Sequence, residues 1–551
     1  MRYKSLKSSS ILLHCTIIFS GILLSLSRPV EHDSVLSGLA YGGYVVFPES
    51  GLAYSSLMIP NLTTVISSFW LTNTLAVGVT NFLLTFTGFL LFIYAQFLIL
   101  RRYFDNRPEL VLIAIVLTLW NPVYDLFSTA YPAVLPGTTT TFGLFGIGLA
   151  FITISNLLAR NYVSAGIYFG LLFGTHLTFF MITSFLASSY FLLLWAKTKT
   201  CLQIKQFISG SITTSFLSIL LYLSSPQKFR MRQMDASEED LYRDYLANID
   251  VHRDPTFEFP SSIPMINIAI VLFILILIAY KKIYGASSSG RLILIFLFGF
   301  GAITLVVYLI QIVLSENLST SFFHTYMLWR FTNLFGLVLS PFVIVTLVLS
   351  AKIVLEKAHF NLRFFGFLAN LQKISIVVVF LLLIRAEFLG GIEDSMTSKN
   401  ASNMNQMNDT CLSNSKLKVA LTSPSLSREI ITRCRQPILL LNGLDNIPYQ
   451  RGELKAYDSI LRDIYNLKME DPPNHLLHSA TLSDVGLEAL WVKITPESWA
   501  LLSSRFGFQE VIVPRTWQEL ALCKIKNGSK NATFVRYTTK SICQRKFSPD
   551  R

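Results

Sequence analysis

The chain has 551 residues, of which 52% are hydrophobic and only 14% are charged. A soluble domain usually carries about 25% charged residues, so this composition excludes an ordinary soluble globular protein. The formal net charge of +13 would suggest a nucleic-acid partner in a soluble chain. Lysines and arginines that gather in short cytoplasmic loops explain that charge without nucleic acid.

Apolar segments follow one another along the first 390 residues. A transmembrane helix needs about 20 predominantly apolar residues, so the pattern predicts a polytopic α-helical membrane protein with about 11 transmembrane helices in residues 1–390. Asn121-Pro122 interrupts the third segment, and the fifth is short for a full crossing. The segments are 11–27, 76–100, 110–120 with its polar continuation, 140–158, 162–174, 178–196, 206–224, 264–280, 292–314, 331–351 and 374–390.

Basic residues mark alternate connections between these segments, as in "LRRYFDNR", "WAKTKT" and "AYKKIYGASSSGR". By the positive-inside rule, this asymmetry predicts a cytoplasmic N-terminus and, after an odd number of crossings, an extracytoplasmic C-terminal region. The longer connections 28–75, 121–139, 225–263 and 315–330 are then outer loops.

The first segment has two interpretations. "MRYKSLK", the apolar run and Ser25-Leu26-Ser27 are compatible with a cleaved signal peptide. We favour a retained helix. In both cases Glu31 emerges on the outer face.

The C-terminal region reads as a small α/β domain, 418–551, after a linker rich in Ser, Asn and Met at 391–417. "PILLLNG", "ALWVKI" and "QEVIVP" are typical of strands, and "GELKAYDSILRDIYNLK" has helical spacing. "TPESWALLSSRFG" predicts a helix with Thr495 as N-cap, Pro496 at the first position and Gly507 as the stop. Without a glycine-rich phosphate loop or a hydrolase motif, this domain is expected to serve as a lid or docking module.

Four of the six cysteines lie in this region: Cys411, Cys434, Cys523 and Cys543. An even set in an extracytoplasmic domain predicts two disulfides, with three pairings open. A zinc site is not predicted, since no Cys-x-x-Cys pair occurs.

Several candidate site residues fall on the predicted outer face. Each alone has an ordinary explanation, such as a solvated carboxylate, a hydrogen-bonded turn histidine or a snorkelling arginine. Their common side of the membrane predicts that they converge on one pocket. They are Glu31 and Asp33 in "EHD", His176 in "FGTHLT", His252, Arg253 and Asp254 in "VHRDP", and Arg330.

This layout resembles the integral-membrane glycosyltransferases of the C-type superfold, which use polyprenyl-phosphate sugars. "SAGIYFGLLFGTHLTFFMITSFLASSYFLLL" is similar to a glycine-rich membrane hairpin with an apical histidine found in several such families. Those families carry one or two acidic residues in the first outer loop, and Glu31 and Asp33 occupy that place. The resemblance implies transfer of a sugar from a polyprenyl-phosphate donor to an envelope glycan, lipid or protein acceptor on the outer face.

The chemistry fits these residue types. Glu31 or Asp33 is expected to deprotonate the acceptor hydroxyl. Arg253 and Arg330, with His176, His252 and Asp254, are expected to bind the donor around its phosphate. No cofactor is required, and a divalent cation is compatible with the reaction.

Two other functions stay open. A transporter or lipid flippase is one, although no internal repeat is evident and charges inside the spans are few. A non-catalytic membrane assembly protein with the outer domain as its binding module is the other.

Overall fold

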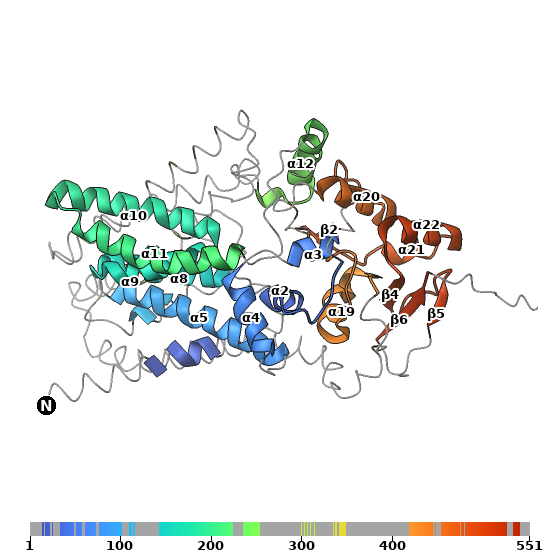
Figure 1. Ribbon diagram of the computed structural model, residues 1–551, viewed down its shortest axis with the longest axis horizontal. Coiled ribbons are helices and arrows are strands. Elements are labelled where there is room, and N and C mark those ends of the chain that lie inside the picture. Colours follow the sequence, from blue (N-terminus) through green and yellow to red (C-terminus); the bar gives the residue numbers. More distant parts are fainter. Residues whose placement is uncertain are drawn as a thin grey trace, which may run out of the picture.

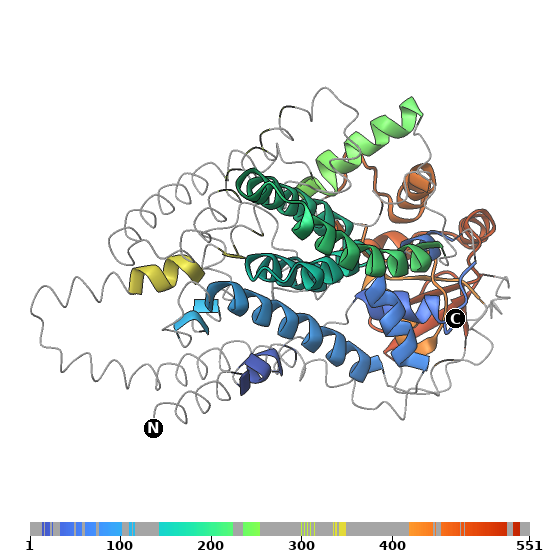
Figure 2. The same cartoon turned by 60° about the vertical axis from the view of Figure 1, so that its left-hand side comes forward.

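The computed structural model describes 33–48, 51–57, 61–72, 77–101, 143–223, 235–253, 341–348, 418–444, 453–473, 480–525 and 533–539. It also describes single residues and short pieces within 14–25, 110–115 and 299–338, and residues 411, 447, 475, 477 and 478. Apolar helices lie at one side of the molecule and an α/β domain at the other, as Figures 1 and 2 show from two directions.

The prediction of a polytopic membrane protein with about 11 transmembrane helices is wrong. Among the described residues, two helices are long and apolar enough to cross a membrane, α5 (Val77–Arg101) and α10 (Leu177–Thr198). The predicted segments 264–280 and 374–390 lie outside the described residues, and 11–27, 110–120, 292–314 and 331–351 are only partly described.

A further pair of apolar helices explains the difference in physical terms. α8 (Gly143–Leu158) and α9 (Tyr162–Phe173) have 16 and 12 residues, fewer than the roughly 20 that span a bilayer. Thirteen consecutive residues of α8, Gly143 to Ser155, are buried inside the protein. A helix that is apolar all round can be a protein core helix, so hydropathy alone overcounted the spans. α11 (Leu202–Leu223) is long, but Gln203, Lys205 and its serines and threonines make it more polar.

The helices α5, α8 and α10 run in the same direction. Gly88 and Leu91 of α5 lie against Leu144 and Gly148 of α8, respectively. At the start of α10, His176 lies against Gly146 of α8. Farther along, the Tyr190 hydroxyl donates to the Leu157 carbonyl at 3.1 Å. Both neighbours of α8 therefore progress along it in parallel.

A stripe of small residues brings α9 and α11 together, also in parallel. A Cβ on Gly166 would stand 2.1 Å from the Phe207 carbonyl oxygen, and one on Gly210 would stand 2.2 Å from that of Val163. One turn on, Thr214 Oγ1 donates to the Ile167 carbonyl at 2.8 Å. Small residues spaced by four let backbones approach and bond across the interface, which is the packing typical of membrane helices.

This common direction gives the bundle of apolar helices two unlike ends. α5, α8 and α10 finish, and α9 and α11 begin, at the end that carries exposed basic residues. We call this the basic end; it consists of Arg101, Arg160, Lys197, Lys199 and Lys205. The turn Gly174–His176 between α9 and α10 lies at the opposite end.

Three short helices connect the apolar helices to the α/β domain: α2 (Asp33–Tyr41), α3 (Leu52–Leu57) and α4 (Leu62–Thr72). Leu36, Leu39 and Leu57 share one apolar cluster with Ile430 and Ile512 of the α/β domain. Ser56 Oγ and Tyr457 Oη lie 2.9 Å apart across the same contact. The first predicted outer loop thus forms the seat on which the α/β domain rests.

The α/β domain is built on a mixed four-stranded sheet in the order β1-β4-β6-β5. β1 (Ala420–Thr422) is parallel to β4 (Glu510–Pro514). β6 (Phe534–Thr538) is antiparallel to both of its neighbours, β4 and β5 (Cys523–Ile525). A small antiparallel pair, β2 (Leu477–His478) and β3 (Thr481–Leu482), lies apart from it. The helices are α19 (Ser427–Cys434), α20 (Leu454–Tyr465), α21 (Leu487–Trp491) and α22 (Pro496–Phe506).

Most of the helices and strands that local sequence signals predict in this domain are found in the structure. α20, β4 and α22 are present where predicted, and the Thr495 hydroxyl accepts from the Ser498 amide while Gly507 ends α22 at φ 77°. "ALWVKI" was predicted as a strand, but its first three residues end α21 and the rest forms a turn; Trp491 is buried and its indole donates to the Ile464 carbonyl of α20. "PILLLNG" forms only isolated bridges at Ile438 and Gly443.

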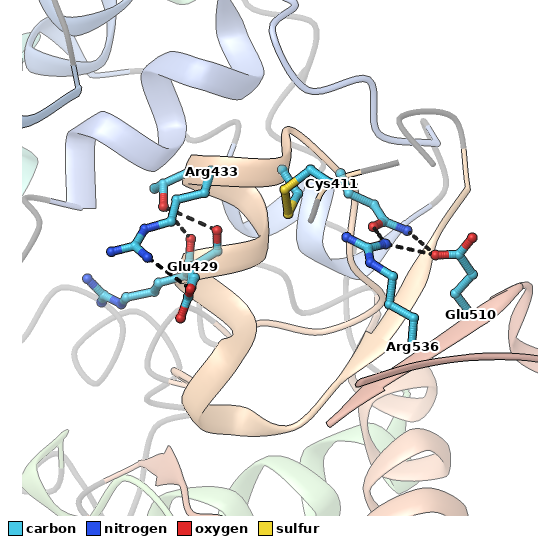
Figure 3. Close-up of a disulfide and its surroundings, with 9 residues drawn as sticks. Cys411, Glu429, Arg433, Glu510 and Arg536 are labelled. Atoms are coloured by element: carbon cyan, nitrogen blue, oxygen red, sulfur yellow. Dashed lines mark hydrogen bonds and ion pairs between the residues drawn. A yellow bond between two sulfur atoms is a disulfide. The ribbon is translucent and has the colours of Figure 1, made fainter. Parts of the chain in front are cut away.

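A disulfide and a buried ion pair constrain the α/β domain (Figure 3). Cys411 is disulfide-bonded to Cys434 at the end of α19, which confirms the predicted disulfide chemistry. Cys523 is also disulfide-bonded, and Cys15 and Cys201 are free thiols. The fully buried Arg536 donates to Glu510 at 3.0 Å and to Gln436 at 2.6 Å. Burial lowers the pKa of Arg536, and the Glu510 carboxylate opposes that shift.

Replacing Gly166 by Ala should destabilise the α9–α11 contact. The new methyl would meet the backbone at Phe207 and Ser211, which cannot move as a side chain can. Overpacking of this kind costs about 1–3 kcal/mol. Gly78→Ala on α5 is the matched control, because a Cβ there would have no atom within 4 Å and Ala stabilises a helix by about 0.5–1 kcal/mol over Gly. Thermal unfolding in detergent should show a lowered Tm for Gly166→Ala and not for Gly78→Ala. Equal Tm values for the two variants would contradict the contact.

Non-reducing peptide mapping should recover the Cys411–Cys434 pair. Cys523 is also disulfide-bonded, Cys15 and Cys201 are free, and Cys543 lies outside the described residues. Among the described cysteines, an alkylating reagent applied before reduction should modify Cys15 and Cys201 only. Alkylation of Cys411 or Cys434 in the native protein would contradict the pairing.

Candidate functional site

The structure describes some of the predicted site residues and not others. Asp33 is the first residue of α2, and His252 belongs to η1 (Val251–Arg253), a short 3₁₀ helix. Glu31, Asp254 and Arg330 lie outside the described residues. His176 and Arg253 are described with their side chains and are both buried.

A series of hydrogen bonds joins the start of α2 to the turn that carries His176. Asn61 Nδ2 donates to the Thr175 carbonyl at 2.8 Å, and Thr63 Oγ1 donates to Asn61 Oδ1 at 2.8 Å. Ser34 Oγ lies 2.6 Å from Thr63 Oγ1. A hydroxyl has one proton, and Thr63 gives its proton to Asn61, so Ser34 must be the donor to Thr63. Asp33 and His176 each stand next to a member of this series.

Helix ends explain why these three segments meet. The Leu62 amide at the start of α4 donates to the Gly174 carbonyl at 2.8 Å, and Gly174 is the C-cap of α9. Amides at a helix N-terminus and carbonyls at a helix C-terminus lack partners within their own helices. Here the end of α9 and the beginning of α4 satisfy each other. Their opposite partial charges also attract.

His176 is held in one orientation as the N-cap of α10. Its Nδ1 accepts from the Phe179 amide at 3.5 Å, and its ring centroid lies 4.2 Å from that of Phe179. Gly146 of α8 leaves room for the side chain, because a Cβ there would stand 2.7 Å from the His176 Cβ. With Nδ1 as acceptor, the neutral ring carries its proton on Nε2. The cap and the contact with Phe179 thus fix the orientation of the His176 ring.

Arg253 belongs to a different cluster. Its Nε donates to Asp250 Oδ2 at 2.5 Å, and their side chains are only 5% and 8% exposed. The Tyr245 hydroxyl lies 2.9 Å from the same carboxylate oxygen and 3.0 Å from the Leu444 carbonyl of the α/β domain. The Tyr245 hydroxyl thus connects the ion pair to the contact between α12 (Ala236–Asn248) and that domain. Arg253 therefore has a structural role, because it neutralises the buried Asp250 carboxylate.

The other end of α12 is attached to α20. Asp235 caps α12 in a capping box with Glu238, and Lys455 Nζ donates to its second oxygen at 2.6 Å. The hydrogen bond from Lys455 is the main cause that holds the pKa of Asp235 below its usual range. A lowered carboxyl pKa stabilises the folded state above the unfolded pKa of about 4, and that contribution fades as the pH falls further.

Sequence reasoning missed Ser34, Asn61 and Thr63. "NLT" at Asn61 fits the Asn-x-Thr pattern of a glycosylation site, but the buried Asn61 caps α4 by accepting from the Thr63 amide at 2.9 Å. An asparagine directly before the apolar run "LTTVISSFWL" is the signal that indicates this cap.

No group of three or more His, Cys, Asp or Glu side chains in the described region of the chain could hold a metal ion. Comparison of the sequence with protein-family models and with curated proteins finds no match.

Replacing Asn61 by Ala should lower stability by about 1–3 kcal/mol, because the Thr175 carbonyl and the Thr63 amide lose buried partners. Asn161→Ala is the matched control, since Asn161 also caps a helix, α9, but its side chain makes no capping hydrogen bond. Thermal unfolding in detergent compares the two. Mass spectrometry should find Asn61 without a glycan, and an occupied Asn61 or equal effects of the two variants would contradict the cap.

Replacing Arg253 by Ala should destabilise the protein by about 3–5 kcal/mol, because Asp250 is left as an uncompensated buried charge. Arg243→Ala provides the comparison, since its pair with Asp240 is exposed and worth about 0–1 kcal/mol. The double variant Arg253→Met, Asp250→Asn should recover some of the loss. Unfolding midpoints measure all three, and an Arg253→Ala midpoint like that of Arg243→Ala would contradict the structural role.

Proposed function

We propose that the chain is a glycosyltransferase that moves a sugar from a polyprenyl-phosphate donor to an acceptor at the outer face of a membrane. The observation that carries the proposal is the hydrogen-bond series from Ser34 through Thr63 and Asn61 to the Thr175 carbonyl. It holds the acidic start of α2 and the apical histidine turn at one place. These are two of the features on which the resemblance to the C-type superfold rests, beside the number of spans, which the structure does not bear out.

Each neighbouring group has a role in the proposed reaction. Glu31 or Asp33 removes the proton from the acceptor hydroxyl as the sugar is transferred. His176 donates a hydrogen bond from Nε2 to the departing phosphate, which takes up negative charge as the glycosidic oxygen bond breaks. Arg330 remains a proposed phosphate partner. Arg253 is left out of the donor site because its side chain is buried and its Nε is paired with Asp250.

The position of the site suits a lipid donor. It lies where the apolar helices meet the seat of the α/β domain, so an isoprenoid tail can stay among the helices while the sugar reaches the domain. The basic end lies at the other extreme of the helices, and cations prefer the cytoplasmic side of a membrane. The disulfide Cys411–Cys434 on the side of the site suits an oxidising, extracytoplasmic compartment.

The test is sugar transfer by the purified full chain from a polyprenyl-phosphate sugar to a panel of glycan, lipid and peptide acceptors. Asp33→Asn and Glu31→Gln are measured separately. The variant that lacks the base should lose about 10²- to 10⁴-fold in rate. Glu519→Gln is the matched control, because its carboxylate is 78% exposed and pairs with Lys524 at the surface.

Two outcomes would contradict the proposal. Full transfer by both carboxylate variants would show that the loop with Glu31 and Asp33 has no catalytic role. No transfer by the intact chain from any donor, combined with retained binding of a protein partner to the α/β domain, would favour the non-catalytic assembly function. The Tm of each variant must match that of the wild type, so that unfolding is not read as lost chemistry.

A further inference from the structure

The basic end combines cations with aromatic rings at the ends of the two candidate spans. At the end of α10, Lys199 Nζ lies 4.9 Å from the centroid of the Trp195 ring. At the end of α5, the Arg101 guanidinium carbon lies 5.9 Å from the centroid of Phe97. Tryptophan and lysine next to each other at a helix end are typical of the level of lipid headgroups.

An exposed apolar face leads away from this end along α10 and α11. On α10, Phe185, Leu192 and Leu193 are more than half exposed. On α11, Ile212 and Phe216 are exposed to 62% and 60%. Exposed large side chains over two neighbouring helices are unfavourable in water and mark a contact with lipid or protein. The chain length of α10, 22 residues, matches the thickness of a bilayer core.

The occupant that fits both features is a phospholipid bilayer. Acyl chains would cover the apolar face, and the cations at its end would meet the headgroup phosphates. Four of these cations are close in sequence to the α8–α9 and α10–α11 turns: Arg160, Lys197, Lys199 and Lys205, all exposed. Arg160 and Lys199 have positive φ values of 63° and 56°, at the turns themselves.

We propose that these four residues form a binding site for anionic phospholipid headgroups, in the leaflet opposite the α/β domain. The proposal rests on the membrane placement given above and is independent of sugar transfer. Each basic residue near an anionic membrane surface is worth about 1 kcal/mol, which corresponds to about fivefold in affinity. The four together should favour an anionic lipid over a zwitterionic one by about a hundredfold or more.

The test uses the purified full chain in a non-ionic detergent, titrated with short-chain phosphatidylglycerol or phosphatidylcholine, with lipid retention read by native mass spectrometry and thermal shift. Wild-type protein should bind phosphatidylglycerol and show a raised Tm. A variant with Arg160, Lys197, Lys199 and Lys205 all changed to Gln should lose about a hundredfold or more in that affinity.

The matched control changes four basic residues outside the apolar helices to Gln: Arg243, Lys493, Arg515 and Lys524. It alters the net charge by the same amount and should keep phosphatidylglycerol binding. Equal loss in both variants would overturn the site, because the attraction would then follow net charge alone. Equal binding of phosphatidylcholine, or the same thermal shift with inorganic phosphate, would also overturn it. Sugar transfer is not measured, so failure here leaves the proposed reaction separately testable.

Discussion

The arrangement depends on one interhelical cap, in which the start of α4 closes the end of α9. Asn61 and the Leu62 amide together satisfy the carbonyls of Thr175 and Gly174. Through Thr63 the same asparagine reaches Ser34 at the start of α2. Because α2 and α3 also contact the α/β domain, these few buried hydrogen bonds fix the position of that domain relative to the apolar helices. Buried polar groups are costly when unsatisfied, so such a junction has one preferred geometry.

A second constraint gives the bundle of apolar helices two unlike ends. The close approach of α9 to α11 requires Gly166 and Gly210, and it aligns the two helices in parallel. With α5, α8 and α10 also parallel, exposed cations collect at one end and buried hydroxyls, an amide and a histidine at the other. A lipid-linked substrate needs such an asymmetric scaffold, since its tail and its sugar prefer different surroundings.

The sequence was informative where local chemistry decides the structure. Thr495, Pro496 and Gly507 define α22, and the helical spacing of "LKAYDSILRDIY" defines α20. The number of spans could not be predicted in this way, because an apolar run such as α8 serves equally for lipid contact and for burial inside the protein. Nor could hydropathy show that "ALWVKI" ends a helix at Trp491 and continues as a turn, with the Trp491 indole buried and bonded to α20.

Two segments of the candidate site were singled out from the sequence, and their role in catalysis stays a prediction. "EHD" and "FGTHLT" suggested the α2 start and His176, and the structure links their segments. Their link is Asn61, which lies 28 residues from one and 115 from the other and shows its role only once α4 meets α9. Arg253 illustrates the converse. Its position beside His252 suggested a ligand, but the charge that pairs with it, Asp250, is three residues away on the same turn.

The sidedness of the helices is tested most directly by labelling single cysteines with a membrane-impermeant maleimide in sealed vesicles. Cys15 and Cys201 are first changed to Ser, and a cysteine is then placed at Ser237 in α12 or at Lys199 at the basic end. Both positions are exposed. The account predicts that one of the two is labelled in sealed vesicles and the other only after permeabilisation. Labelling of both positions without permeabilisation would contradict it, because the site and the basic end would then lie in the same compartment.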